Sequence, residues 1–225
     1  MDALKSFEQE GILFHGNENA VENLAQKECA TIAVVSDSHG DTRSLAVVLK
    51  NIENCDALVF CGDGVSDCLS LLGTFLSDPK IMIPPVIALV RGNNDLAFFS
   101  LKNPETGTLS SISAPSDVML TAAGHKIFIT HGHKYGIYAG IKSMVDEAKR
   151  NDAHAVLFGH THTASYADSD GILALNPGSI SLPRENQPKC FAKMYFEKGR
   201  KPSDWAFFTI KGEEILPFKY PVPLE

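Results

Sequence analysis

Short apolar runs alternate with amphipathic stretches from residue 31 onward. The runs 32–36, 57–61 and 86–90 are about five residues long, which is typical of strands buried on both faces. Between them, apolar residues recur at helical spacing, first at Leu45, Val48, Leu49 and Ile52 and then at Leu69, Leu72 and Phe75. Strands that alternate with helices in this way predict βαβ units and a largely parallel sheet.

Polar residues before each helical repeat predict where the helices begin. Asp41 or Thr42 can cap the first helix, and Ser66 or Asp67 can cap the second. A third helix is predicted over 137–150, with Ile141, Met144, Val145 and Ala148 on one face.

The second half of the chain is richer in hairpin patterns. Residues 118–130 and 165–175 each contain two strand-like segments around a turn with glycine, and 155–158 is a further buried strand. Segments 191–196 and 205–210 alternate as strands do. We therefore expect two sheets packed face to face, with helices outside.

Residues 1–30 differ from the rest. Leu4, Phe7, Ile12 and Leu13 form a weak helical stripe, and Val21 with Leu24 can start another helix. We predict an N-terminal extension over 1–30, packed on the surface of a main domain over 31–225. A partner-binding role for this extension is the alternative.

Composition narrows the functional classes. The 225 residues are 44% hydrophobic, enough for a substantial core, and the formal charge of −7 argues against an extended nucleic-acid surface. Five cysteines without a Cys-x-x-Cys pair suit a reducing compartment. The most apolar stretch, 81–90, contains Pro84 and Pro85 and is too short to cross a membrane, and the first residues lack a secretion signal. We expect a cytoplasmic protein with no membrane partner.

Metal-binding side chains follow five predicted strands. The segments are Asp37-Ser38-His39, Gly62-Asp63, Gly92-Asn93-Asn94-Asp95, His131-Gly132-His133 and Gly159-His160-Thr161-His162. The intervals between them fit one helix and one strand, or a hairpin, so all five can return to the same sheet edge. Side chains two residues apart can face the same way if the backbone is extended.

Each motif alone has an ordinary interpretation. A single His-x-His pair is more often a surface feature, and Gly-Asp is common in turns. Their joint occurrence after separate strands instead predicts a metal site. Such a site supports hydrolysis, and a phosphate ester is the expected substrate.

The ordered motifs resemble those of the calcineurin-like metallophosphoesterases. The compact size, the His131-Gly132-His133 form and the segment Asn176-Pro177-Gly178-Ser179 are similar to the YfcE-like phosphodiesterase branch. The resemblance covers residues 31 to about 215. It implies an α/β fold, a four-layer αββα sandwich of two mixed β-sheets flanked by helices, with a calcineurin-like phosphoesterase domain over 31–225.

The resemblance also implies two metal ions. One would be held by Asp37, His39 and His162, the other by Asn93, His131 and His160, and Asp63 would bridge them. Imidazoles favour transition metals, while carboxylates and an amide oxygen suit manganese. We expect two divalent ions, Mn²⁺ first, with iron, nickel, cobalt or zinc able to substitute. With both aspartates ionised and a bridging hydroxide, the centre keeps about one positive charge, which attracts a phosphoryl group.

One departure from the family pattern affects the leaving group. Many larger relatives have a histidine directly after the Gly-Asn pair that aids the leaving group, and here that position is Asn94. An amide does not titrate near neutral pH, so we take His133 as the candidate catalytic acid. A hydrogen-bonding role for His133 behind the ligands is the alternative. Asp95 is expected to orient its loop or a ligand histidine.

The resulting hypothesis is a metal-dependent phosphodiesterase that hydrolyses small phosphodiesters with a hydroxide activated by two metals. A phosphomonoesterase is the near rival, because both reactions use the same metal pair. A non-catalytic scaffold, similar to the retromer subunit of this fold, is the alternative from another class. Homo-oligomerisation stays open.

Overall fold

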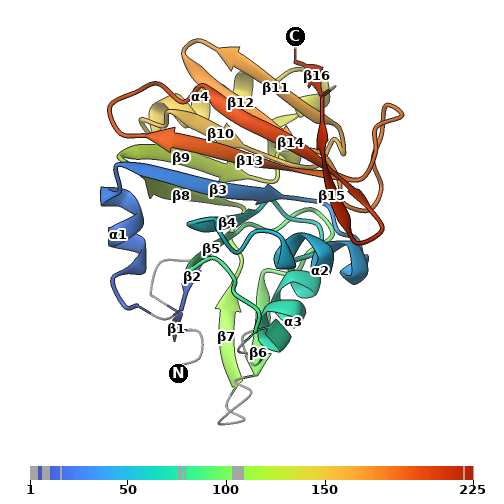
Figure 1. The fold of residues 1–225 in the computed structure, drawn as a ribbon. Helices are drawn as coiled ribbons and strands as arrows, with labels where there is room; N and C mark the ends of the chain where they lie inside the picture. Colours follow the sequence, from blue (N-terminus) through green and yellow to red (C-terminus); the bar gives the residue numbers. More distant parts are fainter. Residues whose placement is uncertain are drawn as a thin grey trace.

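Two β-sheets pack face to face in the computed structural model (Figure 1), which describes residues 5–6, 11–15, 17–75, 78, 80–102, 109–219 and 221–224. The first sheet has eight strands, in the order β1 (Lys5–Ser6), β2 (Ile12–Phe14), β5 (Val86–Leu89), β4 (Ala57–Phe60), β3 (Cys29–Val35), β13 (Cys190–Glu197), β14 (Asp204–Lys211) and β15 (Glu214–Phe218). The second has six, in the order β16 (Val222–Pro223), β11 (Ala164–Ser169), β12 (Ile172–Pro177), β10 (Ala155–Leu157), β9 (His125–Thr130) and β8 (Asp117–Ala122). A separate hairpin joins β6 (Phe98–Lys102) to β7 (Leu109–Ser113).

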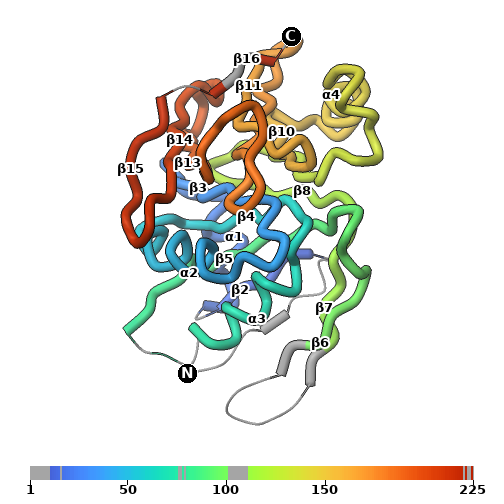
Figure 2. The backbone as a smooth tube through the Cα atoms, turned by 90° about the vertical axis from the view of Figure 1, so that its right-hand side faces the viewer, coloured from blue at the N-terminus to red at the C-terminus, as the bar shows by residue number. Residues whose placement is uncertain are grey.

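Both sheets are mixed, as predicted. β3, β4 and β5 run parallel, and β13 joins β3 antiparallel. In the second sheet β9, β10 and β12 are parallel, while β8 and β11 complete the two predicted hairpins. β3 runs toward the right of Figure 1, so the loops that follow the parallel strands of the first sheet face the viewer in Figure 2.

The helices α2 (Thr42–Lys50), α3 (Val65–Phe75) and α4 (Lys142–Arg150) cover the outer faces of the sheets. The helix α1 (Ala20–Gln26) lies at the edge of the sandwich, where its buried Ala20 and Leu24 belong to the core between the sheets. One core lies between the two sheets and includes Val34, Val59 and Ile129. A second core joins α2 and α3 to the first sheet, and a third joins α4 to the second sheet. The predicted α/β architecture of two sheets between helices is confirmed.

The caps of the first two predicted helices have different outcomes. The Asp41 carboxylate accepts a hydrogen bond from the Ser44 amide at 2.9 Å, so Asp41 caps α2 as predicted. α3 already begins at Val65, so the prediction that Ser66 or Asp67 caps it is wrong. Asp67 instead accepts hydrogen bonds from the loop that follows β3.

The helix predicted over 137–150 begins later than expected. Residues Ile137–Ala139 form a single 3₁₀ turn, and α4 starts only at Lys142. Gly140 separates the two with φ at 117°, a left-handed conformation that helices do not contain.

The N-terminal region is built into the first sheet, not laid on its surface. Ile12, Leu13 and Phe14 form β2, which pairs antiparallel with β5, and all three are at most 3% exposed. The helical stripe predicted through Ile12 and Leu13 is therefore wrong, while Val21 and Leu24 do lie in α1. Leu4 and Phe7 lie outside the described residues. The division of the chain at residue 30 stays a prediction.

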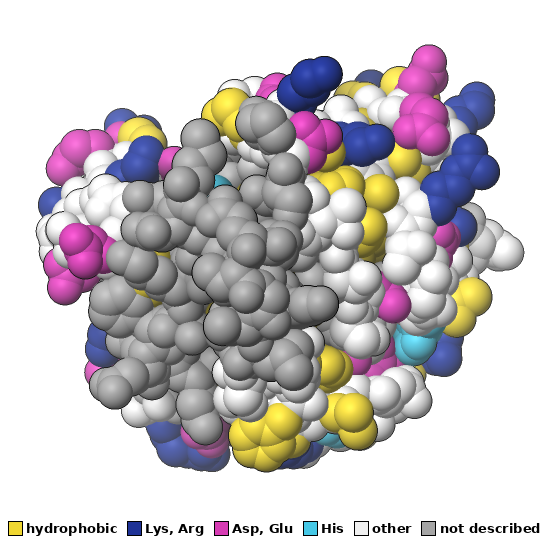
Figure 3. Space-filling model, turned by 90° about the horizontal axis from the view of Figure 1, so that it is seen from below, with side chains coloured by type: hydrophobic (Ala, Val, Ile, Leu, Met, Phe, Trp, Pro, Cys, Tyr) yellow, Lys and Arg dark blue, Asp and Glu magenta, His cyan; other side chains and the backbone are white. Residues whose placement is uncertain are grey.

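The described surface is mixed in charge on the face seen in Figure 3. Lys and Arg side chains are interspersed there with Asp and Glu, and neither sign is gathered into one region. Within the described ranges, no helix combines the length and apolar character needed to span a bilayer.

Candidate metal centre

The predicted ligands lie in loops that leave neighbouring strands. Asp37 follows β3, Asp63 follows β4, His131 follows β9 and His160 follows β10. Backbone and side-chain contacts join these loops across the two sheets: the His160 amide donates to Asp37 Oδ2 at 3.2 Å, and His131 Nδ1 lies 2.7 Å from the Cys61 carbonyl. Residues far apart in sequence therefore meet at one end of the sandwich.

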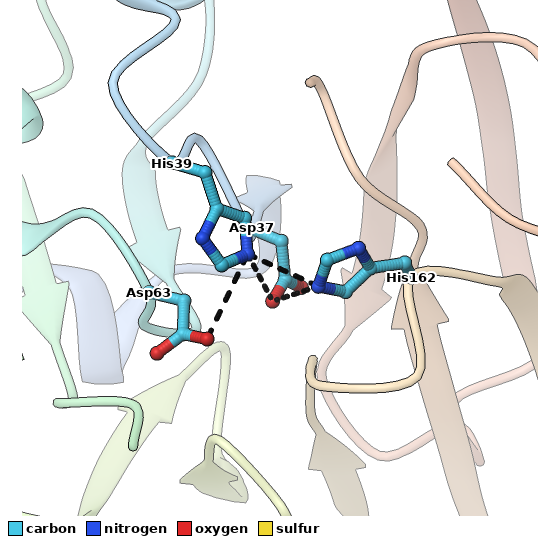
Figure 4. A group of neighbouring side chains, drawn as sticks. All are labelled: Asp37, His39, Asp63 and His162. Atoms are coloured by element: carbon cyan, nitrogen blue, oxygen red, sulfur yellow. Dashed lines mark hydrogen bonds and ion pairs between the residues drawn. The ribbon is translucent and has the colours of Figure 1, made fainter. Parts of the chain in front are cut away.

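Four of them form a tight group, which we call the first metal group: Asp37, His39, Asp63 and His162. One potential ligand atom from each lies within 4.8 Å of the others. His162 Nε2 is 3.2 Å from Asp37 Oδ1, and His39 Nε2 is 3.7 Å from Asp63 Oδ2. Figure 4 shows the four side chains pointing toward one another, Asp37 and His39 from the loop after β3 and Asp63 and His162 from two other loops. Two carboxylates and two imidazoles in this arrangement suit a divalent transition metal.

The backbone of these loops is left-handed at most ligand positions. Positive φ values occur at Asp37 (56°), His39 (41°), Asp63 (54°), His160 (69°) and His162 (59°). The pairs 37/39 and 160/162 therefore do not meet the condition of extended backbone under which their side chains would face the same way. Left-handed residues other than glycine cost about 1–3 kcal/mol each and persist only where surrounding contacts hold them, as at functional sites.

Hydrogen bonds from the second sheet hold the His160 loop and the Asp37 loop. Asn176 is buried and donates to the Gly159 carbonyl at 2.7 Å and to Thr161 Oγ1 at 3.0 Å. Ser179 Oγ donates to the Asp37 carbonyl at 2.8 Å. A side chain at Gly159 would lie 2.9 Å from Asp37 Oδ2, so the loops can approach this closely only with glycine there.

The Asp95 carboxylate connects the loops after β4 and β5 through hydrogen bonds. It accepts hydrogen bonds from the amides of Asp63, Gly64, Val65 and Gly92, at 2.7–3.0 Å. The expectation that Asp95 orients its loop is confirmed.

Asn94 has a role that the sequence did not reveal. Its backbone amide donates to Asp63 Oδ1 at 2.9 Å, and its side-chain amide donates to Asp63 Oδ2 at 2.7 Å. These two bonds fix the plane of the Asp63 carboxylate. An asparagine in a polar loop gives no sequence signal for a partner 31 residues away.

The other predicted ligands form a looser set, which we call the second metal group: Asn93, His131 and His160, beside Asp63, the predicted bridging residue. His131 Nε2 is 3.5 Å from Asp63 Oδ2, and the His131 and His160 ring centroids are 5.1 Å apart. Asn93 is exposed in the turn directly before Asn94. His131 thus lies beside Asp63 and His160 lies beside His131, while Asn93 lies at the surface in the loop after β5.

The ring orientations leave nitrogen lone pairs for a metal. His131 Nδ1 and His162 Nδ1 each lie 2.7 Å from a backbone carbonyl, of Cys61 and Leu182 respectively, and donate to it. In the neutral form of each ring, the lone pair is then on Nε2, the atom that faces the centre. Within the part of the chain that the structure describes, the buried atoms Asp37 Oδ1 and His131 Nε2 have no hydrogen-bond partner. Buried polar atoms of this kind call for a ligand, so the site fits metal ions.

The electrostatics of the centre keep its carboxylate charged. Burial would raise the pKa of Asp63, but neighbouring His131 and the hydrogen bonds from Asn94 hold that pKa well below its usual range. Burial also opposes protonation of His131 and His162, yet the carboxylates beside them raise the pKa of both imidazoles. The Asp63 carboxylate is therefore available as an anionic ligand at neutral pH.

His133 lies next to the second metal group. Its ring centroid is 5.4 Å from that of His131 and 6.2 Å from that of His160. Burial, followed by the proximity of His131, lowers the pKa of His133. Its Nδ1 is buried without a hydrogen-bond partner among the described residues.

A family model matches most of the chain. The model for the calcineurin-like phosphoesterase superfamily domain matches residues 31–199, most of the chain. The chain belongs to this superfamily. The predicted resemblance is thereby confirmed, and the matched region contains every candidate ligand.

Named relatives point the same way. A probable metallophosphoesterase, YsnB of Bacillus subtilis (strain 168), is 30% identical over 185 residues, which are 82% of this chain and 94% of YsnB. The phosphodiesterase YfcE of Escherichia coli (strain K12) is 29% identical over 83 residues, 37% of this chain and 41% of YfcE. The protein is a metal-dependent phosphoesterase related to the YfcE branch.

Solved structures confirm the fold. A predicted phosphoesterase from Streptococcus pneumoniae TIGR4 matches with a TM-score of 0.60 at 25% identity, over 85% of this chain and 98% of that one. Vacuolar Protein Sorting 29 from Cryptosporidium parvum also matches with a TM-score of 0.60, at 18% identity, over 85% of this chain and 97% of that one. The second likeness is one of fold alone.

Proposed function

We propose that the protein is a two-metal phosphodiesterase that acts on small phosphodiesters. The observation that carries the proposal is the gathering of Asp37, His39, Asp63 and His162 within 4.8 Å, two of them fully or nearly fully buried aspartates. A buried group of this kind is stable only when its charge is compensated, and divalent cations compensate it.

Two metal positions share Asp63 in this proposal. Asp37, His39 and His162 would hold one ion, and Asn93, His131 and His160 the other. Mn²⁺ is the proposed ion, because the set mixes imidazole nitrogens with carboxylate and amide oxygens. When bound, a pair of ions supplies an activated water at neutral pH and neutralises the charge of the phosphoryl group.

The proposal of a diester substrate, in place of a monoester, depends mainly on Asn94. Asn94 uses its side-chain amide on Asp63 Oδ2 and cannot donate a titrating proton to a leaving group. The phosphodiesterase activity in the name of YfcE supports the same choice. A phosphomonoesterase remains the rival within this site, and paired assays with an aryl diester and the matching aryl monoester separate the two.

His133 is the proposed proton donor to the leaving group. Its ring lies beside the rings of His131 and His160, two of the proposed ligands of the second ion. The lowered pKa of His133 favours the alternative, a neutral ring that only donates a hydrogen bond. His133→Ala is expected to slow diesters with poor leaving groups at least tenfold more than diesters with good ones. Equal losses on both would exclude the acid role.

The scaffold alternative has less support. A protein that only binds partners has no need of a complete ligand set, and here all seven positions carry a side chain able to ligate. The likeness to Vacuolar Protein Sorting 29 extends to the fold and adds nothing about partners.

The direct test is hydrolysis of bis(p-nitrophenyl) phosphate by the purified full chain. Turnover is expected in the presence of Mn²⁺. It is expected to stop when a chelator is added and to return when Mn²⁺ is restored. Asp37→Asn is expected to abolish turnover, while Asp168→Asn, which alters an exposed ion pair with Lys201 far from the ligand loops, serves as the matched control. Chelation-resistant turnover, or none with any divalent metal, would contradict the proposal.

A further inference from the structure

An exposed tyrosine stands beside the candidate metal centre. Tyr138 lies in the 3₁₀ turn Ile137–Ala139 and is 65% exposed. Its ring centroid is 5.3 Å from that of His160, a member of the second metal group. A large aromatic face is thus open to solvent at the edge of a polar site.

The position of this ring is fixed from two sides. Tyr138 Oη donates to the His160 carbonyl at 3.3 Å and accepts from Arg184 Nη1 at 3.1 Å. The Arg184 backbone amide in turn donates to the His162 carbonyl at 3.0 Å. Tyr138 is therefore bonded directly to the backbone of His160 and, through Arg184, to the backbone of His162.

The turn itself is anchored in the core. Ile137, directly before Tyr138, is buried in the core beneath α4. Its Cδ1 atom lies 2.9 Å from the position that a Cβ atom at Gly132 would take, so it packs directly against the backbone of that glycine. A ring that is held before the ligand arrives loses little conformational freedom on binding, so its contact area contributes to affinity with little entropic cost.

A second exposed apolar side chain comes from the loop of Arg184. Leu182 is 55% exposed, and its carbonyl accepts the hydrogen bond from His162 Nδ1. Single exposed apolar residues are ordinary. Tyr138 and Leu182 differ from such residues because each is bonded to the backbone or ring of a candidate ligand histidine.

We propose that Tyr138 determines specificity by stacking on an aromatic ester group of the substrate. The substrate class is a phosphate ester that carries a planar aromatic ring, aryl or nucleobase, within reach of the metal-bound phosphoryl group. Arg184 acts as a positioning residue that holds the tyrosine. This inference rests on the proposed function, because the phosphoryl group must be held by the metal centre for its ester group to reach Tyr138.

Binding of three phosphate analogues to the Mn²⁺-loaded protein tests the inference without turnover. The probes are inorganic phosphate, methylphosphonate and phenylphosphonate, and calorimetry gives their dissociation constants. The wild-type protein is expected to bind phenylphosphonate about tenfold more tightly than methylphosphonate, which corresponds to about 1.4 kcal/mol. Tyr138→Leu, which keeps an apolar side chain without a ring, is expected to reduce this preference to about twofold or less.

Two further variants separate stacking from structural effects. Tyr138→Phe keeps the ring and is expected to keep most of the preference. Tyr195→Leu removes another exposed tyrosine, on β13, and is expected to leave the preference unchanged. A Tyr138→Leu variant that weakens all three probes equally would overturn the inference in favour of a role in holding His160.

Failure of the inference and failure of the proposed function give different results. Wild-type protein that binds phosphate in a Mn²⁺-dependent way, but binds both phosphonates equally, would overturn the inference alone. Absence of any Mn²⁺-dependent phosphate binding would overturn the proposed function and the inference with it.

Discussion

The two metal groups differ in how completely the folded chain prepares them. The first group brings Asp37, His39, Asp63 and His162 within 4.8 Å, with both carboxylates buried. The second group shares Asp63 but otherwise offers two imidazoles and the exposed amide of Asn93. Anionic ligands and a preformed geometry both strengthen metal binding, so the first position is expected to bind Mn²⁺ more tightly than the second.

The largest effect is expected from Asp63→Asn, which alters the side chain that the two groups share. Loss of its charge removes an anionic ligand from both positions and leaves His131 without its carboxylate neighbour. Activity toward an aryl diester is expected to fall about 100-fold to 1,000-fold. Metal analysis is expected to show weaker binding at both positions, and loss of only one ion would contradict a shared role.

Asn93→Asp tests the difference between the two groups, because it gives the second group a carboxylate of its own, as the first group has. The added charge is expected to tighten the weaker Mn²⁺ dissociation constant about tenfold. It also removes positive charge from the centre, so the Michaelis constant for an anionic diester is expected to rise. Calorimetry and steady-state kinetics check the two effects, and unchanged metal and Michaelis constants would refute the assignment of Asn93.

Asn94→Ala tests whether the position of Asp63 matters as well as its charge. The change removes the side-chain hydrogen bond to Asp63 Oδ2 and keeps the backbone bond to Oδ1. Loss of a partner that orients a metal ligand typically costs about 10-fold to 100-fold in metal affinity or activity. Wild-type values in this variant would show that the backbone bond alone orients Asp63.

Asp41→Ala is the smallest of these changes and tests a neighbouring structural role. Asp41 caps α2 two residues after His39 and is paired with Lys189. Loss of the cap is expected to lower the free energy of unfolding by about 1 kcal/mol, measured by urea denaturation. Mn²⁺ affinity is expected to stay within twofold of wild type, and a loss as large as that of Asn94→Ala would mean that loop order limits metal binding.

Much of the fold could be predicted because its signals are local. The strands at 32–36, 57–61 and 86–90, the Asp41 cap and both hairpins depend on short patterns of apolar residues and turns. β2 was mistaken for part of a helix because three apolar residues fit either period. The strand β15 went unpredicted because it lies at the edge of the first sheet and its side chains are largely exposed. The hairpin of β6 and β7, which forms a separate two-stranded sheet, also went unpredicted.

The candidate ligands could be selected from sequence, but their geometry could not. Asp37 and His39 would face the same way on extended backbone, but both lie at positive φ, where tertiary contacts such as the Ser179 bond to the Asp37 carbonyl hold the loop. The supporting roles of Asn94 and Asn176 also depend on partners remote in the chain. Such pairings exist only after the sheets have assembled, so a single sequence carries no direct signal for them.

The most direct measurement is anomalous diffraction from crystals soaked in Mn²⁺. Two peaks about 3.5–4 Å apart are expected, one among Asp37, His39 and His162 and one among Asn93, His131 and His160, with Asp63 between them. The first peak is expected to reach full occupancy at the lower Mn²⁺ concentration. A single peak at saturating Mn²⁺, or peaks away from these side chains, would contradict the account.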